Sequence, residues 1–303
     1  MRNILASTLV AYASKPEFVF LTGDLGFMAL EPVQQAAGSR FINAGVAEQN
    51  MVSVAAGMAR VGLKPWVYSI APFVYARAFE QIRNDVCYHK LPVFLVGNGG
   101  GYAYGVMGGT HHALEDYGAL LTLRNLTAYV PAFGADVPAI AARMYAAERA
   151  AYLRLGRDEA PADFVVPPYE PLRQVLAGPG PTLLIVGPLA GGILAALLTL
   201  PQEKRPATWV LSELPICDGS LTEPFLADLK RSDHLIVVEE HTAQGSAGQM
   251  LAHTLLLRSA VPRRFAHRCA VGYPSGRFGS QNYHRRQCGL DPAAILAYLN
   301  GRQ

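Results

Sequence analysis

The sequence predicts an α/β protein built from two doubly wound domains. Short apolar stretches alternate with helical stretches from residue 18 to residue 155, and again from residue 182 onward. This alternation is typical of parallel sheets with helices on both faces. Between the two regions, six prolines and few strand signals predict a linker. We therefore expect a first domain over 1–158, a linker over 159–181 and a second domain over 182–303.

The elements of both domains follow from the hydrophobic pattern, in chain order. An amphipathic helix opens the chain, followed by a buried strand at 18–21. The rest of the first domain is predicted to contain helices over 47–60, 75–89 and 137–149, and strands over 65–70, 91–96, 127–131 and 151–155. The second domain is predicted to contain strands over 183–186, 208–211 and 235–239, and helices over 192–200, 221–230 and after Gly245. Ligands of such sheets bind beyond the carboxyl ends of the strands, so residues that follow strands are site candidates.

Composition excludes several classes of function. The chain has 303 residues, of which 51% are hydrophobic and 16% charged, so it can bury large cores and interfaces. A net charge of +3 is too small to indicate nucleic-acid binding. The longest apolar stretch, residues 186–200, is too short and too broken by Pro and Gly to span a membrane. The four scattered cysteines form no close pair, which argues against a zinc site or disulfides and favours a reducing, cytoplasmic location.

A single carboxylate at the start of a helix is the most distinctive feature of the first domain. In the run FINAGVAEQNMVSVAAGMA, residues 41–59, an extended segment and a Gly turn precede the helix. Apolar residues at helical spacing place Glu48 in the first turn. The helix dipole favours a carboxylate there, while apolar neighbours restrict its hydration. Spacing alone also allows a surface glutamate that simply begins the helix.

This run resembles the pyrimidine-binding domain of thiamine diphosphate enzymes, specifically the transketolase and deoxyxylulose-phosphate synthase group. Four further segments occur in the family's order and extend the resemblance over nearly the whole chain: LTGDLGF at 21–27, GGTHHALED at 108–116, VVEEHTAQGSAGQM at 237–250 and SGRFGSQNYHRRQCGLD at 275–291. The resemblance implies two domains, a pyrimidine-binding fold followed by a transketolase C-terminal-type fold. It also implies transfer of a two-carbon ketol or acyl unit through a carbanion–enamine adduct of thiamine diphosphate.

The resemblance assigns cofactor contacts to the first domain. Glu48 is implied to hydrogen-bond a ring nitrogen of the aminopyrimidine and to push it toward its imino form. The segment that contains Phe73, Tyr75 and Arg77 lies where the family places its stacking aromatic side chains. Phe73 is the first candidate for stacking and Tyr75 the second, with ordinary core packing as the alternative.

The resemblance also assigns residues to the substrate. His111 is implied to face the reacting carbon and to move protons, and His112 to line the same site. Arg157, in the family's RLGR segment, is implied to meet an anionic acceptor, together with Arg154 just upstream.

Two positions depart from the family pattern. By counting from Thr110, the position of the hydroxyl-reading Asp is Met107, and that of the phosphate-reading His falls near Gly99. Both positions lack the polar group, so we expect an acceptor other than an ordinary aldose phosphate.

A missing motif predicts a partner. The family binds its diphosphate through a divalent metal with GDG followed by Asn, whereas this chain has Gly23-Asp24-Leu25 in the wrong domain. We therefore expect no metal site here, and a partner subunit that holds the diphosphate and Mg²⁺ or a similar ion, in a heterotetramer of two plus two chains. The chain would then be the C-terminal half of a split transketolase. The alternatives are the β subunit of a 2-oxoacid dehydrogenase decarboxylating component, a non-catalytic scaffold paralogue, and a nucleotide-binding Rossmann protein.

Overall fold

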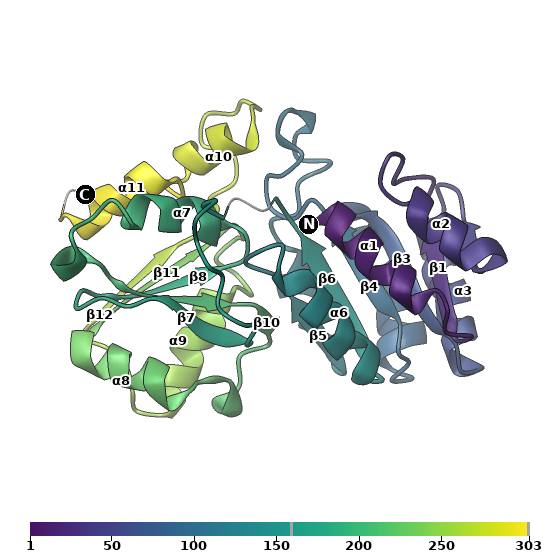
Figure 1. The fold of residues 1–303 in the computed structure, drawn as a ribbon, viewed down its shortest axis with the longest axis horizontal. Helices are drawn as coiled ribbons and strands as arrows, with labels where there is room; N and C mark the ends of the chain where they lie inside the picture. Colours follow the sequence, from purple (N-terminus) through teal and green to yellow (C-terminus); the bar gives the residue numbers. More distant parts are fainter. Residues whose placement is uncertain (158–159, 302–303) are drawn as a thin grey trace.

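Two sheets lie side by side, one in each half of the chain, and helices cover both faces of each sheet (Figure 1). The computed structural model describes residues 1–157 and 160–301. The predicted α/β class with two helix-covered, mainly parallel sheets is confirmed. The boundary predicted at residues 158 and 159 lies outside the described residues.

The first sheet has seven strands in the order β10-β5-β6-β4-β3-β1-β2. Six of them are parallel: β1 (Phe18–Thr22), β2 (Phe41–Asn43), β3 (Lys64–Ile70), β4 (Phe94–Asn98), β5 (Leu126–Tyr129) and β6 (Ala150–Leu155). One face packs against α1 (Arg2–Tyr12), α2 (Glu31–Ala37) and α6 (Asp136–Ala146). The other face packs against α3 (Glu48–Arg60), the turns that follow β3, and α5 (Asp116–Leu120). Burial on both faces explains why these strands read as continuous apolar runs.

The second sheet has five strands in the order β12-β11-β8-β9-β7. Its strands are β7 (Leu172–Leu176), β8 (Thr182–Val186), β9 (Ala207–Leu211), β11 (His234–Glu239) and β12 (Arg264–Arg268). In Figure 1, one face carries α7 (Leu189–Leu197), α10 (Gln281–Gln287) and α11 (Pro292–Leu299), and the other α8 (Glu223–Ser232) and α9 (Ala247–Leu257). Short 3-10 segments complete the described elements: η1 (Gly38–Arg40), η4 (Gly105–Met107), η5 (Gln202–Lys204) and η6 (Asp218–Ser220).

The structure corrects the predicted linker and one predicted helix. Within residues 159–181, β7 pairs antiparallel with β9, a strand too short to be recognised among flanking prolines. The predicted helix over 75–89 begins earlier and consists of π-helical turns η2 (Phe73–Arg77) and η3 (Ile82–Cys87) around α4 (Phe79–Gln81). A hydrophobic period of 3.6 does not reveal such wide turns, which are frequent at functional sites.

The second half of the chain also completes the first sheet. After β9, the chain returns to the first domain as β10 (Glu213–Leu214), which pairs antiparallel with β5. The carbonyl of Ser212 accepts a hydrogen bond from the amide of Val130 beside this pairing. Residues from both halves therefore share one sheet, a connection that the separate domains predicted from sequence did not contain.

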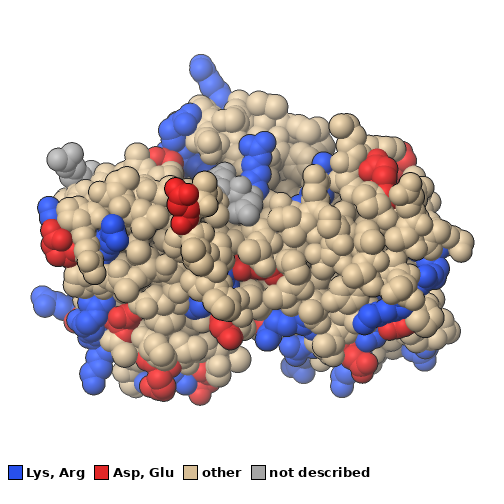
Figure 2. Space-filling view, in the orientation of Figure 1, with Lys and Arg blue, Asp and Glu red and all other residues tan. Residues whose placement is uncertain are grey.

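The surface carries charge of both signs. Figure 2 shows Lys and Arg interspersed with Asp and Glu on this face, without one continuous patch of a single sign. None of the helices in residues 1–157 and 160–301 is both long and apolar enough to cross a membrane.

Candidate active site

Glu48 is the first residue of α3, and its side chain is only 4% exposed. Both carboxylate oxygens accept hydrogen bonds of 3.1 Å from Nη1 of Arg77. A Cβ atom at Gly23 would lie 3.8 Å from Oε1 of Glu48, so the absent side chain leaves space beside the carboxylate. The helix dipole adds a further stabilisation of the charge at this position.

Phe73 and Arg77 lie at the two ends of the π-helical turn η2 and complete this cluster. The guanidinium carbon of Arg77 lies 3.9 Å from the centroid of the Phe73 ring, a cation–π contact. A flat, nitrogen-bearing group thus stacks on Phe73 and donates hydrogen bonds to Glu48. These are the contacts that an aminopyrimidine ring requires, so the residues fit the pyrimidine end of thiamine diphosphate.

Tyr75 lies away from this cluster. Its ring is 8% exposed and belongs to the core beneath the sheet. Its hydroxyl donates a hydrogen bond of 3.3 Å to Oε2 of Glu115, and burial raises its pKa above the ordinary value. The geometry favours Phe73 over Tyr75 as the stacking ring, in the order expected from sequence.

His111 lies next to the Glu48 cluster, on a loop of residues 99–113 that follows β4; we call this segment the His111 loop. The His111 ring meets the Phe73 ring edge-on at 5.1 Å between centroids, and lies 5.9 Å from the Tyr104 ring. Its Nδ1 is 2.9 Å from the hydroxyl oxygen of Thr110. The imidazole therefore has a defined orientation beside the aromatic ring.

The second domain holds the His111 loop in place. The amide of Tyr102 donates to Oε1 of Glu240 at 2.7 Å, and the Tyr102 hydroxyl donates to the carbonyl of Gly272. His112 is buried, with Nδ1 2.8 Å from the Tyr273 hydroxyl and Nε2 2.9 Å from the carbonyl of Gly105. Burial lowers the pKa of His112 below its ordinary value. The structure therefore places His112 in the contact between domains rather than beside Phe73.

Arg154 is buried beneath the same loop and is not available to a substrate. Its Nε lies 2.9 Å from Oδ2 of Asp116 in an ion pair with both side chains at most 5% exposed. Its Nη2 donates to the carbonyls of Ala113 and Glu240. The expectation that Arg154 could meet an anionic acceptor is therefore wrong, because the buried guanidinium is engaged in holding the His111 loop.

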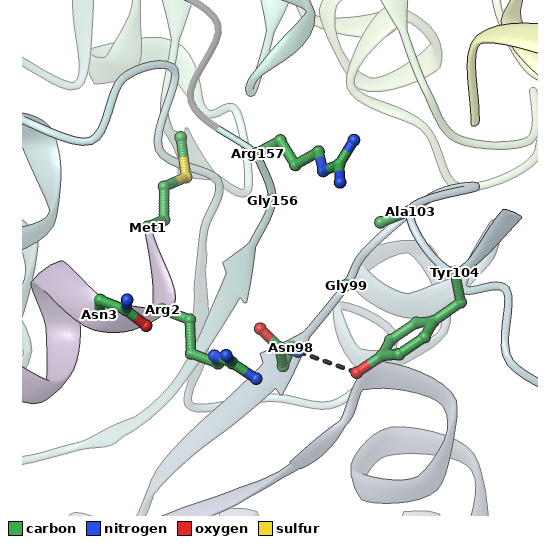
Figure 3. Close-up of a pocket in the computed structure, with 9 residues that line it drawn as sticks. All are labelled: Met1, Arg2, Asn3, Asn98, Gly99, Ala103, Tyr104, Gly156 and Arg157. Carbon is green, nitrogen blue, oxygen red and sulfur yellow. Dashed lines mark hydrogen bonds between the residues drawn. The ribbon is translucent and has the colours of Figure 1, made fainter. Parts of the chain in front are cut away.

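Arg157, by contrast, lines a cavity of about 720 Å³ at the end of β6, which we call the Arg157 cavity. Figure 3 shows Arg2 and Arg157 reaching it from different elements, with Asn98 and Tyr104 between them. The full lining is Met1, Arg2, Asn3, Asn98, Gly99, Ala103, Tyr104, Gly156 and Arg157. Arg157 is exposed and most of the other lining residues are partly exposed, so this is an open site with polar walls.

The sequence did not reveal Arg2 or Tyr104 as site residues. Burial raises the pKa of the Tyr68 hydroxyl, and the charge and hydrogen bond of Arg2 oppose this rise, which places the Arg2 guanidinium against Tyr68. Arg2 begins an ordinary amphipathic helix, so nothing in its local sequence signals a site. Met107, in contrast, is 53% exposed and is not part of the cavity lining.

The fold and the Glu48 cluster together define a class, the pyrimidine-binding half of a thiamine diphosphate enzyme. Residues 1–162 match the family described as "Transketolase, pyrimidine binding domain". A "Putative uncharacterized transketolase family protein y4mN" from Sinorhizobium fredii is 31% identical, over 88% of this chain and 77% of that protein. The chain belongs to the transketolase family, and the resemblance stated from sequence is confirmed.

Several relatives are separate subunits. A subunit of the apulose-4-phosphate transketolase of Phocaeicola vulgatus is 28% identical over 97% of this chain and 94% of its own length. The "6-deoxy-6-sulfo-D-fructose transketolase subunit SqwH" of a Clostridium species is 28% identical over 98% and 92%. A solved structure titled "Split gene transketolase, inactive beta4 tetramer" superposes with a TM-score of 0.82 at 26% identity, covering 99% of this chain and 97% of that chain. The transketolase of Campylobacter jejuni shares the fold at a TM-score of 0.76 and 16% identity, with only 46% of that chain covered.

Proposed function

We propose that this chain is the pyrimidine-binding subunit of a split transketolase, which transfers a two-carbon ketol or acyl unit to an acceptor with an anionic end. The observation that supports this is a continuous row of side chains. Glu48 bonds Arg77, which stacks on Phe73, and the Phe73 ring contacts His111. Tyr104 then links His111 to the Arg157 cavity. The row provides a carboxylate, a stacking ring, a proton-transfer group and a cationic end in the order that the reaction needs.

Each residue of the row has a role that follows from its chemistry. The chemistry that thiamine diphosphate supplies when bound is a nucleophilic carbon for two-carbon transfer. Glu48 would hydrogen-bond a ring nitrogen and share its proton, which its burial and its place at a helix start favour. Phe73 would stack on the ring once Arg77 moves aside, because the half-exposed Arg77 is free to be rehydrated. His111 would exchange protons with substrate oxygens.

The cationic end would hold the substrate's anionic group. Arg157 and Arg2 line one cavity from two elements, so an anion between them would meet two guanidinium groups. Guanidinium groups suit phosphate and other planar or tetrahedral oxyanions. The names of two relatives mention a sugar phosphate and a sulfonated sugar, which supports an oxyanion-terminated substrate for this chain too. We propose, as the sequence predicted, that the acceptor is not an ordinary aldose phosphate.

A partner subunit would hold the diphosphate and a divalent ion such as Mg²⁺, in an assembly of two plus two chains. Large apolar side chains are exposed beside the Glu48 cluster: Phe27 is 72%, Met28 89% and Val46 77% exposed. Gly23, four residues before Phe27, and Gly45, next to Val46, both lie against the Glu48 region. Exposed apolar residues around a site favour coverage by another protein surface. Relatives named as single subunits of two-chain transketolases support the same assembly.

Calorimetry and activity of the reconstituted pair test this proposal. The isolated chain should bind thiamine diphosphate and Mg²⁺ weakly, and the co-expressed pair with a chain that contains GDG and a following Asn should bind both tightly. The pair should transfer two-carbon units, with Glu48→Gln as the inactive variant. Tight binding or turnover by the isolated chain, or a pair that forms NADH with a lipoyl protein in place of ketol transfer, would contradict the proposal.

A further inference from the structure

Tyr104 fills the space in front of Gly99. A Cβ atom placed on Gly99 would lie 2.2 Å from Cε2 of the Tyr104 ring. Gly99 has a φ of +76°, which a residue with a side chain rarely adopts. The missing side chain at residue 99 is therefore not an empty position, because the Tyr104 ring takes the room that a side chain would need.

The Tyr104 hydroxyl is held in one orientation. The amide Nδ2 of Asn98, the last residue of β4, donates a hydrogen bond of 2.8 Å to this hydroxyl (Figure 3). The phenol oxygen thereby acts as an acceptor toward the protein and retains its own proton. Burial raises the pKa of Tyr104, and the Asn98 hydrogen bond and the Arg2 charge only partly oppose this rise, so the phenol stays protonated near neutral pH. What the hydroxyl can offer a ligand is a hydrogen-bond donor.

The donor lies between the reacting end and the cationic end of the row. The Tyr104 ring is 5.9 Å from the His111 ring on one side. On the other side it lines the same cavity as Arg2 and Arg157. A substrate that reaches from His111 to the guanidinium groups must pass the Tyr104 hydroxyl.

We propose that Tyr104 is the residue that determines acceptor specificity, by donating a hydrogen bond to an oxygen between the reacting carbon and the anionic group of the substrate. This inference rests on the proposed function, since it takes the Arg157 cavity as the anion site. It revises the expectation that the loss of a polar side chain at residue 99 leaves this part of the site apolar. The chemical class selected is an oxyanion-terminated chain with at least one hydroxyl or carbonyl oxygen along it.

The test compares two probes that differ in their hydroxyl groups, glycerol 3-phosphate and propyl phosphate, by titration calorimetry on the full chain. The chain should prefer glycerol 3-phosphate by roughly three- to tenfold, the effect of one neutral hydrogen bond in water. Tyr104→Phe should abolish this preference and leave the affinity for propyl phosphate unchanged. Tyr102→Phe, on the same loop but outside the cavity lining, is the matched control and should retain the preference. Arg157→Ala should weaken both probes about equally.

The outcomes separate the two levels of the inference. If Arg157→Ala weakens both probes but Tyr104→Phe retains the preference, the role of Tyr104 is refuted and the anion site stands. If Arg157→Ala changes neither affinity, or if the chain binds neither probe at millimolar concentration, the cavity is not the anion site and both proposals fall. If the preference disappears in Tyr104→Phe alone, the proposed donor is supported.

Discussion

Replacing Glu48 with glutamine tests the central residue of the proposed site with little change in shape. The Glu48–Arg77 pair has one half-exposed partner, so solvent screening leaves it about 0–1 kcal/mol of stability. The interaction with the α3 dipole adds about 0.3–1 kcal/mol. Because glutamine avoids the burial of a charge, we expect Glu48→Gln to change the free energy of unfolding by no more than about 1–2 kcal/mol. Folding and assembly with a partner should therefore survive.

The effect on chemistry should be much larger than the effect on stability. Glutamine can hydrogen-bond a ring nitrogen but cannot share a proton with it. Proton–deuterium exchange at the thiazolium carbon, followed by NMR in the reconstituted pair, should slow by more than the roughly 10²–10⁴-fold of a typical acid–base group. Glu80→Gln, an exposed carboxylate on α4, is the matched control and should leave exchange unchanged. An unchanged exchange rate in Glu48→Gln would refute the assignment, and loss of assembly in light scattering would show a structural role instead.

Three further predictions concern proton transfer and stability. His111→Asn should lower kcat by roughly 10²–10⁴-fold with an unchanged melting temperature, because its half-buried ring makes only edge contacts; an unaltered kcat would exclude it from proton transfer. Asp116→Asn leaves the buried Arg154 without its ion-pair partner and should destabilise the chain by about 3–5 kcal/mol in urea unfolding, whereas a loss below about 1 kcal/mol would show that the pair matters little. Burial raises the pKa of Glu239, but the hydrogen bond from His267 and other contacts lower it overall to below the ordinary 4.5. Its stabilisation is therefore present above pH 4.5 and is lost as the pH falls through the folded-state pKa, so Glu239→Gln should flatten the acid limb of stability against pH, and an equally steep limb would contradict this.

The fold was predictable from the sequence because buried parallel strands leave a local signal. Apolar runs such as residues 18–21 and 235–239 became β1 and β11 with shifts of one residue at their ends. Strands that depend on a distant partner left no such signal. The two residues of β10 form a strand only because β5 lies beside them, and β7 is hidden among prolines. Pairing between sequence-distant segments is a tertiary property that local patterns do not contain.

The site divides in the same way. Glu48, Phe73, Arg77 and His111 were found from motifs, and the structure brings them together in one row. Arg2 was missed, because only the packing of α1 against the sheet places it near Arg157. Tyr104 was also missed, since counting along the chain compares one position at a time, whereas its ring fills the space of residue 99 from five residues away.

The second domain contributes to this site by holding the His111 loop rather than by adding to the row. Its Glu240 is buried, accepts from the amide of Tyr102 and pairs with Arg285, while its carbonyl accepts from Arg154 of the first domain. A buried, hydrogen-bonded charge network is costly to disrupt partly, so it favours a single arrangement of the groups bound to it. The loop that it holds has several glycines, which without these contacts would allow many conformations. A proton-transfer group must lie within hydrogen-bond reach of its target, and this network supplies the rigidity that a glycine-rich loop lacks. The connection explains physically why a domain without a residue in the row adjoins the pyrimidine-binding domain in one chain.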